Sequence, residues 1–308
     1  MEERLRENLC KLTSNPVQWD CPLAPFTSFG IGGPAEALIT VESSAELFSL
    51  LKFFTANDLH WRLIGKGSNL LVSDEGFAGG VLLFGKALSG ITPLDESASG
   101  DVRIRVGAGC SMARLLSWCM KRGYAGLEFS AGIPGSLGGA VVMNAGAWGG
   151  EIADVIRSLN VLSLNSGEEI LSRRELDFRY RLWHNQADGD VRRLVLSVDI
   201  CLKQGDKEEV QSRCHKYLQQ RKEKQPKAQK NAGSFFKNPP GDSAGRLIEA
   251  SGLKGKNCGG AMVSPVHANF LVNTGMATAD DVQKLMQIVT DKVKEDSGIQ
   301  LQPEVHFL

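Results

Sequence analysis

The chain has 308 residues, of which 42% are hydrophobic and 23% are charged. This composition is typical of a folded globular protein and excludes a disordered one. The 35 basic residues balance 35 acidic residues, which argues against a general binder of nucleic acid or of anionic membranes, since their affinity comes from excess positive charge. No apolar run approaches the length of about 18 residues that spans a membrane.

Cysteine usage predicts reduced thiols. The seven cysteines are odd in number, and none belongs to a Cys-x-x-Cys pair. Cys214 and His215 are adjacent, but no further ligand follows at the spacing of a metal site. We therefore expect no bound metal, and a reducing compartment, the cytoplasm.

Short apolar runs alternate with helical patterns over the first 204 residues. Ser43, with Glu46 in the third position after it, is a capping-box pattern that opens a helix. A second helix is expected from Met112 to Lys121 and ends before Gly123. The apolar runs predict strands at Leu38–Val41, Trp61–Ile64, Val81–Phe84, Val102–Val106, Ser158–Leu164 and Leu194–Leu202.

The character of the chain changes after residue 204, where we place a domain boundary. A polar helix is predicted from Lys207 toward Gln225, broken by Pro226. Its end lies in a run of basic residues between positions 216 and 230, which is usually a solvated helix face and otherwise a phosphate-binding surface. The elements expected beyond it are a helix at Ser243–Ala250, a strand at Asn269–Val272 and a helix from Thr278 to Ser297 that Gly298 closes.

The common nucleotide-binding fingerprints fail on this sequence. The stretch from Gly65 ends at Leu70, where a dinucleotide fingerprint requires its third glycine. Residues 80–87 have the spacing of a P-loop, but Ala87 replaces the residue whose hydroxyl binds magnesium, and the intervening residues favour a strand. No Gly-x-Ser-x-Gly or His-Glu-x-x-His motif occurs.

Two glycine-rich stretches remain, at residues 65–69 and 131–150, and each follows or adjoins an apolar run. Successive backbone N–H groups in such loops can bind phosphate oxygens without a cationic side chain. Taken singly, each loop is equally well explained as a tight turn. Taken together, they indicate a cofactor that carries a diphosphate.

These stretches, together with residues 178–181, the sequence NAGSFFKNP at 231–239 and residues 267–270, occur in the order of a known family. The chain resembles the UDP-N-acetylenolpyruvoylglucosamine reductases, flavoenzymes of peptidoglycan precursor synthesis, over roughly residues 22 to 305. The stretch 231–239 is highly specific for that family. Because no insertion between residues 181 and 194 is long enough for an extra substrate-covering loop, the resemblance is to the shorter, type II class.

The resemblance implies an α+β fold, in which a two-lobed FAD-binding region of the vanillyl-alcohol-oxidase type precedes a smaller α/β substrate-binding domain. We expect lobes at residues 1–86 and 87–204 and the substrate-binding domain at residues 205–308. In that family NADPH reduces non-covalently bound FAD, and the flavin then passes hydride to the enolpyruvyl double bond of UDP-N-acetylglucosamine enolpyruvate. Protonation of the neighbouring carbon gives UDP-N-acetylmuramate. The family further implies a cytoplasmic monomer whose partners are small molecules, without nucleic acid or membrane.

The resemblance implies three catalytic residues. Ser234 matches the proton donor, which must be held against a very basic enolate because a hydroxyl is a weak acid. Arg181 matches the cation that stabilises negative charge on the substrate carboxylate, and Glu304 matches the third position. From local sequence alone, Ser234 is a turn residue, Arg181 is one of several neighbouring arginines and Glu304 is a surface carboxylate.

The resemblance also implies ligand contacts. The residues expected at FAD are Gly67, Ser68, Asn69, Gly132, Pro134, Gly135, Gly138, Gly139, Asn144 and Gly146, although several glycines are also explained by turns. The residues expected at the substrate are Tyr180, Lys222, Lys237 and Asn238. His267 is interpreted as a structural hydrogen-bonding residue, because the reaction needs no imidazole base.

Two other functions stay open at this point. An FAD-dependent oxidase of the vanillyl-alcohol-oxidase type would share the glycine-rich loops, but many such oxidases attach flavin to a histidine or cysteine, and residues 61–80 contain neither. A non-catalytic flavoprotein that binds a sugar nucleotide would not depend on Ser234.

Overall fold

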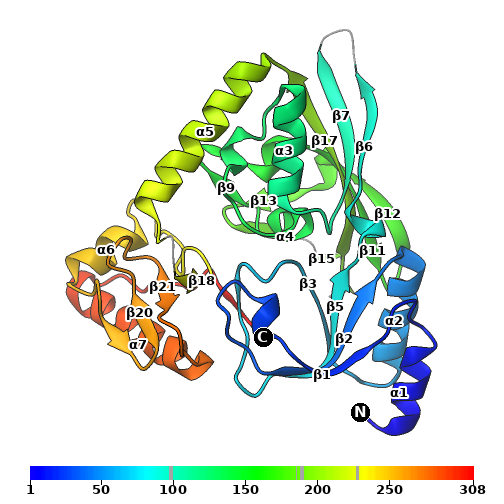
Figure 1. Cartoon of the computed structure of the whole chain (residues 1–308), viewed down its shortest axis with the longest axis horizontal. Coiled ribbons are helices and arrows are strands. Elements are labelled where there is room, and N and C mark those ends of the chain that lie inside the picture. Colours follow the sequence, from blue (N-terminus) through cyan, green and yellow to red (C-terminus); the bar gives the residue numbers. More distant parts are fainter. Residues whose placement is uncertain (97–99, 185, 188–190, 227–228) are drawn as a thin grey trace. The chain divides into compact units, whose positions relative to one another are not determined.

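The computed structural model describes residues 1–96, 100–184, 186–187, 191–226 and 229–308 (Figure 1). Its helices are α1 (Glu3–Cys10), α2 (Ser44–Ala56), α3 (Met112–Arg122), α4 (Leu137–Val142), α5 (Lys207–Lys224), α6 (Ala244–Ala250) and α7 (Ala279–Ser297). Among the helices of the described residues, none combines the length and the apolar character that crossing a membrane requires.

The strands of the first half are β1 (Gln18–Pro22), β2 (Pro34–Val41), β3 (Trp61–Ile64), β4 (Leu70–Leu71), β5 (Phe77–Phe84), β6 (Ile91–Glu96), β7 (Asp101–Gly107), β8 (Tyr124–Ala125), β9 (Gly146–Ala147) and β10 (Gly150–Glu151). Those of the second half are β11 (Ile156–Ser163), β12 (Gly167–Ser172), β13 (Asp177–Arg179), β14 (Leu182–His184), β15 (Gln186–Ala187), β16 (Val191–Arg192), β17 (Leu194–Gln204), β18 (Lys230–Asn231), β19 (Asn257–Cys258), β20 (Ala261–Val263), β21 (Leu271–Asn273) and β22 (His306–Phe307).

Two compact units divide the chain, and each is assembled from separate stretches of sequence. The first unit contains residues 1–18, 37–65 and 79–219, and the second contains residues 19–36, 66–78 and 220–308. The expected division into consecutive domains at residues 86 and 204 stays a prediction.

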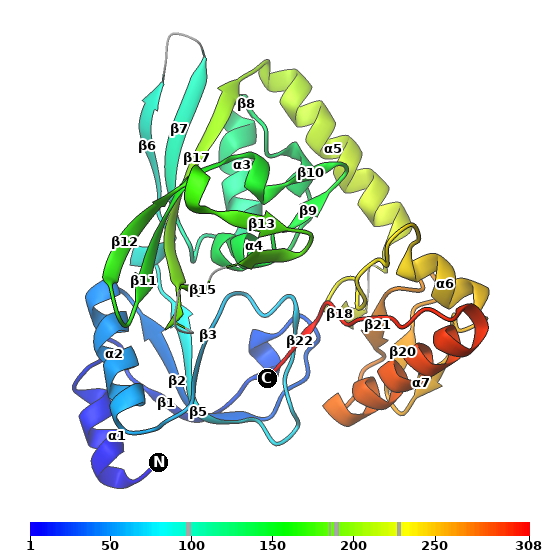
Figure 2. The ribbon, with the colours of Figure 1, turned by 180° about the vertical axis from the view of Figure 1, so that it is seen from behind.

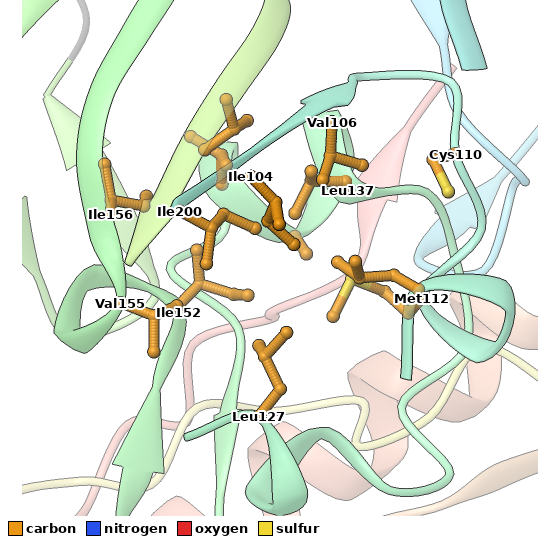
Figure 3. Close-up of a cluster of buried hydrophobic side chains, with 14 of the residues drawn as sticks. Ile104, Val106, Cys110, Met112, Leu127, Leu137, Ile152, Val155, Ile156 and Ile200 are labelled. Carbon is orange, nitrogen blue, oxygen red and sulfur yellow. The ribbon is translucent and has the colours of Figure 1, made fainter. Parts of the chain in front are cut away.

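The largest sheet of the first unit has the strand order β12-β11-β17-β7-β6, and β8 also pairs with β17. Strand β7 shows why these residues form a half-buried strand, because Val102, Ile104 and Val106 are buried and alternate with exposed Arg103 and Arg105. This alternation confirms the period-two pattern seen in the sequence. The buried side chains join those of β11, β17 and α4 in one apolar cluster, shown in Figure 3.

A smaller sheet has the order β1-β2-β5-β3, and β3 runs parallel to β5. Helix α2 packs closely on this sheet, since a Cβ at Gly80 of β5 would lie 2.2 Å from the ring of Phe54. Residues 80–84, tested above as a P-loop, are therefore confirmed as part of a strand.

The second unit contains the sheet β18-β21-β20-β19 with helices α6 and α7 beside it (Figures 1 and 2). Helix α7 buries Val282, Leu285, Val289 and Val293 along one face. Its first residue follows Thr278, which forms a capping box with Asp281, and it ends at Gly298 in a left-handed conformation. The predicted helix and its closing glycine are confirmed.

Two local predictions are wrong in detail. Ser43 caps α2 as predicted, since its hydroxyl accepts the N–H of Glu46 at 3.1 Å. The carboxylate of Glu46, however, accepts the N–H of Glu42 at 2.9 Å and that of Ser14, so the reciprocal bond to Ser43 is missing among the described contacts. The strand predicted to start at Asn269 starts at residue 271, because the side chain of Asn269 bonds another segment.

Candidate active site

In the second unit, the segment that carries Ser234 lies antiparallel to the segment that carries Glu304. The backbone N–H of Glu304 donates to the carbonyl of Phe235 at 2.8 Å, and the N–H of Lys237 donates to the carbonyl of Gln302 at 2.9 Å. A β-bridge between residues 236 and 303 lies between these two bonds. Main-chain pairing thus brings together the segments of two predicted catalytic residues, Ser234 and Glu304, that lie far apart in the sequence.

Asn269 fixes the other side of the Ser234 segment. The N–H of Phe235 donates to its carbonyl at 2.8 Å, and its side-chain amide both accepts the N–H of Phe236 at 2.9 Å and donates to the carbonyl of Phe236 at 2.8 Å. Asn269 is only 3% exposed, so it substitutes for a missing strand neighbour. From the sequence, Asn269 is predicted only as the start of a strand and as part of a family motif, without a role at the site.

The hydroxyl of Ser234 has no hydrogen-bond partner among the residues that the structure describes. The preceding Gly233 has a left-handed φ of 80°, and its N–H donates to the Oδ1 of Asn231 at 2.9 Å. Ser234 is partly buried. Its backbone is therefore held firmly while its hydroxyl stays available to a ligand.

His267 precedes Asn269 by two residues and has the structural role that the sequence predicts. Its Nδ1 accepts the N–H of Asn269 at 3.2 Å, and its ring meets that of Phe270 edge-on at 4.9 Å between centroids. Burial, together with the charge of nearby Lys254, lowers the pKa of His267 below its usual value. A neutral imidazole can accept the backbone N–H of Asn269, and this hydrogen bond stabilises the turn between the two residues.

The predicted substrate residues of the second unit differ in what they contact. The Oδ1 of Asn238 accepts the N–H of Ala244 at 3.1 Å, so its side chain supports the start of α6. Lys237 is partly buried, and its charge, after burial, is the second cause that lowers the pKa of His306. Lys222 is exposed near the end of α5.

Residues 66–69 of the first glycine-rich stretch also belong to the second unit, whereas Gly65 belongs to the first. Gly67 has a φ of 61°, and a Cβ there would lie 2.0 Å from the carbonyl oxygen of Phe26, so only glycine fits. The backbone N–H groups of Lys66, Gly67 and Ser68 donate to no acceptor within the described part of the chain. Consecutive unpaired N–H groups of this kind suit the oxygens of a phosphate group.

The second glycine-rich stretch lies in the first unit and contains a helix that the sequence did not predict. Helix α4 includes Gly138 and Gly139, and Ser136 caps it. Gly132 and Gly135 have left-handed φ values of 77° and 113°, and Pro134 is exposed between them. The first N–H groups of α4 are used by the protein itself, since those of residues 137 and 138 donate to the carbonyls of residues 110 and 108.

Gly139 is the member of this stretch with open space beside it. It is exposed, and a Cβ there would meet only the Oγ of Ser136, at 3.5 Å. A Cβ at Gly138, by contrast, would lie 2.9 Å from the Cβ of Ala108. The bare backbone at Gly139 allows close approach by a planar or phosphate-bearing ligand. Each glycine-rich stretch therefore offers a surface that fits FAD.

Arg181 and Tyr180 form the turn of the β13–β14 hairpin in the first unit. Arg181 has a left-handed φ of 56°, and its Nη2 donates to the carbonyl of Gly146 at 3.1 Å. Tyr180 is 50% exposed, and the Arg181 guanidinium lies 5.0 Å from the centre of its ring. The hairpin thus presents a fixed cation and an exposed phenol next to the second glycine-rich stretch.

The predicted site residues therefore form one set in each unit. The second unit holds Gly67, Ser68, Asn69, Ser234, Lys237, Asn238 and Glu304, together with the exposed Lys222. The first unit holds the second glycine-rich stretch, Tyr180 and Arg181. Within the described residues, no group of three or more histidine, cysteine or acidic side chains gathers at the spacing of a metal site.

Comparison with known proteins identifies the family. Residues 35–171 match the model of an FAD-binding domain, and residues 225–308 match the C-terminal domain of UDP-N-acetylenolpyruvoylglucosamine reductase. The reductase of Syntrophus aciditrophicus is 41% identical over 99% of this chain and 96% of its own length. That of Bacillus pumilus is 39% identical over 99% of this chain and 98% of its own.

A solved structure agrees with these sequence matches. The crystal structure of the corresponding reductase from Thermus caldophilus superimposes with a TM-score of 0.78 at 38% identity, over 95% of this chain and 98% of its own. The expected α+β fold, with an FAD-binding region followed by a smaller C-terminal domain, is thereby confirmed. The chain belongs to the family of UDP-N-acetylenolpyruvoylglucosamine reductases.

Proposed function

We propose that this chain uses NADPH and bound FAD to reduce UDP-N-acetylglucosamine enolpyruvate to UDP-N-acetylmuramate, in the synthesis of peptidoglycan precursors. Family membership gives the reaction class. The observation that carries the proposal is the main-chain pairing of the Ser234 segment with the Glu304 segment, through the 2.8 Å bond from Glu304 to Phe235. This pairing places the backbones of a hydroxyl-bearing and a carboxylate-bearing residue next to each other, and both are groups that transfer protons.

FAD supplies the two-electron transfer between NADPH and the enolpyruvyl carbon. The residues proposed to hold it are those with exposed or unpaired backbone, namely Gly67, Ser68, Gly132, Pro134, Gly135 and Gly139, with Asn69, Gly138 and Gly146 shaping the two loops.

Ser234 is proposed as the donor of the proton to the carbon next to the one that receives hydride. A serine hydroxyl has a very high pKa, so it donates only to a strongly basic enolate and only from a fixed position. The bonds on both sides of Phe235 hold that position, and the hydroxyl itself is unpaired among the described residues. Arg181 is proposed to stabilise the negative charge that develops on the substrate carboxylate. Glu304 is proposed to assist the proton transfer.

The remaining assignments follow from the same reading of the family. Tyr180, Lys222, Lys237 and Asn238 are proposed at the sugar nucleotide; Tyr180 and Lys222 are exposed, and Lys237 is partly so. We place the FAD-binding lobes at residues 1–86 and 87–204 and the substrate-binding domain at residues 205–308. A cytoplasmic monomer is proposed.

An anaerobic titration followed by flavin absorbance tests the function. NADPH should bleach the yellow protein, and UDP-N-acetylglucosamine enolpyruvate should restore the colour with one equivalent of UDP-N-acetylmuramate, identified by mass spectrometry. Colour that returns only with oxygen would overturn the proposal in favour of an oxidase. Protein that cannot be reconstituted with FAD would overturn both.

A further inference from the structure

Helix α4 ends in an unusual way. The N–H of Asn144 donates to the carbonyl of Val141 at 2.9 Å, and the N–H of Ala145 donates to that of Ala140 at 2.8 Å. These two bonds are those of a Schellman motif, and Asn144 occupies its left-handed position, with a φ of 40°. Glycine is the usual residue there because it adopts this conformation without steric cost. An asparagine at this position therefore indicates that its side chain has a specific function.

Both polar atoms of the Asn144 side chain form hydrogen bonds with the protein backbone. Its Nδ2 donates to the carbonyl of Arg179 at 3.1 Å, and its Oδ1 accepts the N–H of Ala153 at 3.2 Å. Asn144 is 0% exposed. A side chain that is completely buried cannot touch a bound cofactor unless the site rearranges, which separates Asn144 from the exposed glycines around it.

Arg179 is the last residue of β13, and the turn after it carries Arg181. The carbonyl of Arg179 is bonded to Asn144, while the Arg181 guanidinium is bonded to the carbonyl of Gly146, two residues further along the same segment. Two side-chain bonds thus run in opposite directions between the segment 144–146 and the hairpin 177–184. Together they fix both the backbone before Arg181 and the Arg181 guanidinium. The backbone of Arg181 is itself left-handed, with a φ of 56°.

We propose that Asn144 is a positioning residue for Arg181 and not a contact of the cofactor. Its amide holds the hairpin so that the guanidinium meets the substrate carboxylate in the correct place. The inference rests on the proposed function, because it assigns Asn144 to the step in which the enolpyruvyl substrate is reduced.

The test compares the two half-reactions by stopped-flow absorbance in the FAD-loaded protein. Asn144→Gly removes the amide but keeps the left-handed backbone, so the variant should fold. Reoxidation by the enolpyruvyl substrate should slow by about 10- to 100-fold, since small misplacements of a catalytic group have effects of this size. Bleaching by NADPH, the flavin spectrum and the affinity for FAD should stay within about threefold, a margin well below the effect of a lost catalytic contact.

A double-mutant cycle separates positioning from a general structural role. In an Arg181→Ala background, Asn144→Gly should slow reoxidation by less than about twofold, because no guanidinium is left to position. Asp58 provides a matched control, since it occupies the left-handed position of the same motif at the end of α2, with a φ of 51°. Asp58→Gly should leave both half-reactions unchanged.

Several results would overturn the inference. They are an Asn144→Gly variant with wild-type reoxidation, an equal loss in the Arg181→Ala background, or a loss of FAD affinity and of NADPH bleaching. If Asn144→Gly does not fold, Asn144→Asp keeps the acceptor for Ala153 and removes the donor to Arg179, and it must show the same selective loss. Wild-type protein that fails to be reoxidised by the enolpyruvyl substrate would instead overturn the proposed function.

Discussion

The side-chain amide of Asn69 donates to the backbone carbonyl of Glu304 at 3.0 Å, although 235 positions separate the two residues. In return, the carbonyl of Asn69 accepts the N–H of His306 at 3.0 Å, and β4 and β22 pair in parallel directly after these contacts. The last residues of the chain therefore complete the loop that carries Gly67 and Ser68. Figure 2 shows β22 in red, extending away from α6 and α7.

Loss of the Asn69 amide should loosen this pairing. Asn69→Ala removes one partly buried hydrogen bond and should lower the free energy of unfolding by about 1 kcal/mol. Asn69→Asp should cost more, because a carboxylate would face the carbonyl oxygen of Glu304. Urea unfolding measures both, and hydrogen exchange at the N–H of His306 should become faster. Two variants as stable as wild type would show that the bond contributes nothing.

The first turn of α7 depends on a carboxylate from the loop between β4 and β5. Asp74 accepts the N–H groups of Ala279 and Asp280 at 2.9 and 3.1 Å. Asp74→Ala should therefore lower the free energy of unfolding by about 1 to 2 kcal/mol, as the loss of a helix cap does. Asp74→Asn should cost less, since it keeps one acceptor. The exposed neighbour Glu75 provides the control, and an equal loss in Glu75→Ala would contradict the capping account.

Gly139 and Gly67 should respond differently to the same added methyl group. Gly139→Ala places a Cβ in open space on a helix and should leave thermal stability unchanged or slightly higher. If FAD lies against this backbone, its affinity should fall by at least about tenfold through steric exclusion alone. Gly67→Ala should instead fail to fold well, because the Cβ would meet the carbonyl of Phe26. Unchanged FAD affinity in Gly139→Ala would remove this residue from the cofactor site.

The sequence predicted those elements whose patterns are local. The period-two alternation of β7, the cap at Ser43 and the closing Gly298 each depend on neighbours within a few residues, and the structure has all of them. Helix α4 is not predicted from the sequence, because Gly138 and Gly139 lower its helix propensity and favour a loop. Tertiary contacts, including the bond from residue 137 to residue 110, override that propensity.

The site could be predicted from the sequence only through the family resemblance. No local pattern links Ser234 to Glu304 or Asn69 to the terminal tail, since those contacts join distant stretches. The sequence carries one signal for Asn269, which is a polar residue directly before an apolar strand. Its bonding partner, the backbone of Phe236, could not be predicted from the sequence. The bond of the Asn144 amide likewise depends on the carbonyl of Arg179, which lies 35 residues further along the chain.

Stability should fall at alkaline pH through buried thiols. Burial raises the pKa of Cys119 from 9.0 to about 12, with the charge of Arg122 opposing the shift. Below pH 9 the thiol is protonated in both the folded and the unfolded chain, so stability is unaffected. Between pH 9 and about 12 the unfolded chain loses this proton and the folded chain keeps it, so the free energy of unfolding decreases as pH rises.

The measurement is urea unfolding at pH 7.5, 9 and 10.5, chosen at roughly even steps across that range. Cys119→Ala should show a shallower decrease than wild type between the two higher values. Parallel curves for the two proteins would contradict the account. Cys10, which is exposed, provides the control, because Cys10→Ala should follow wild type.

Ser234 is proposed to donate the proton in the reduction of the enolpyruvyl group, and the half-reactions of Ser234→Ala test this assignment most directly. The variant keeps the backbone bonds of Phe235 and should fold, bind FAD and be bleached by NADPH at the wild-type rate. Reoxidation by UDP-N-acetylglucosamine enolpyruvate should slow by at least about 100-fold, since a positioned proton donor contributes that much or more. Reoxidation at the wild-type rate would contradict the assignment of Ser234.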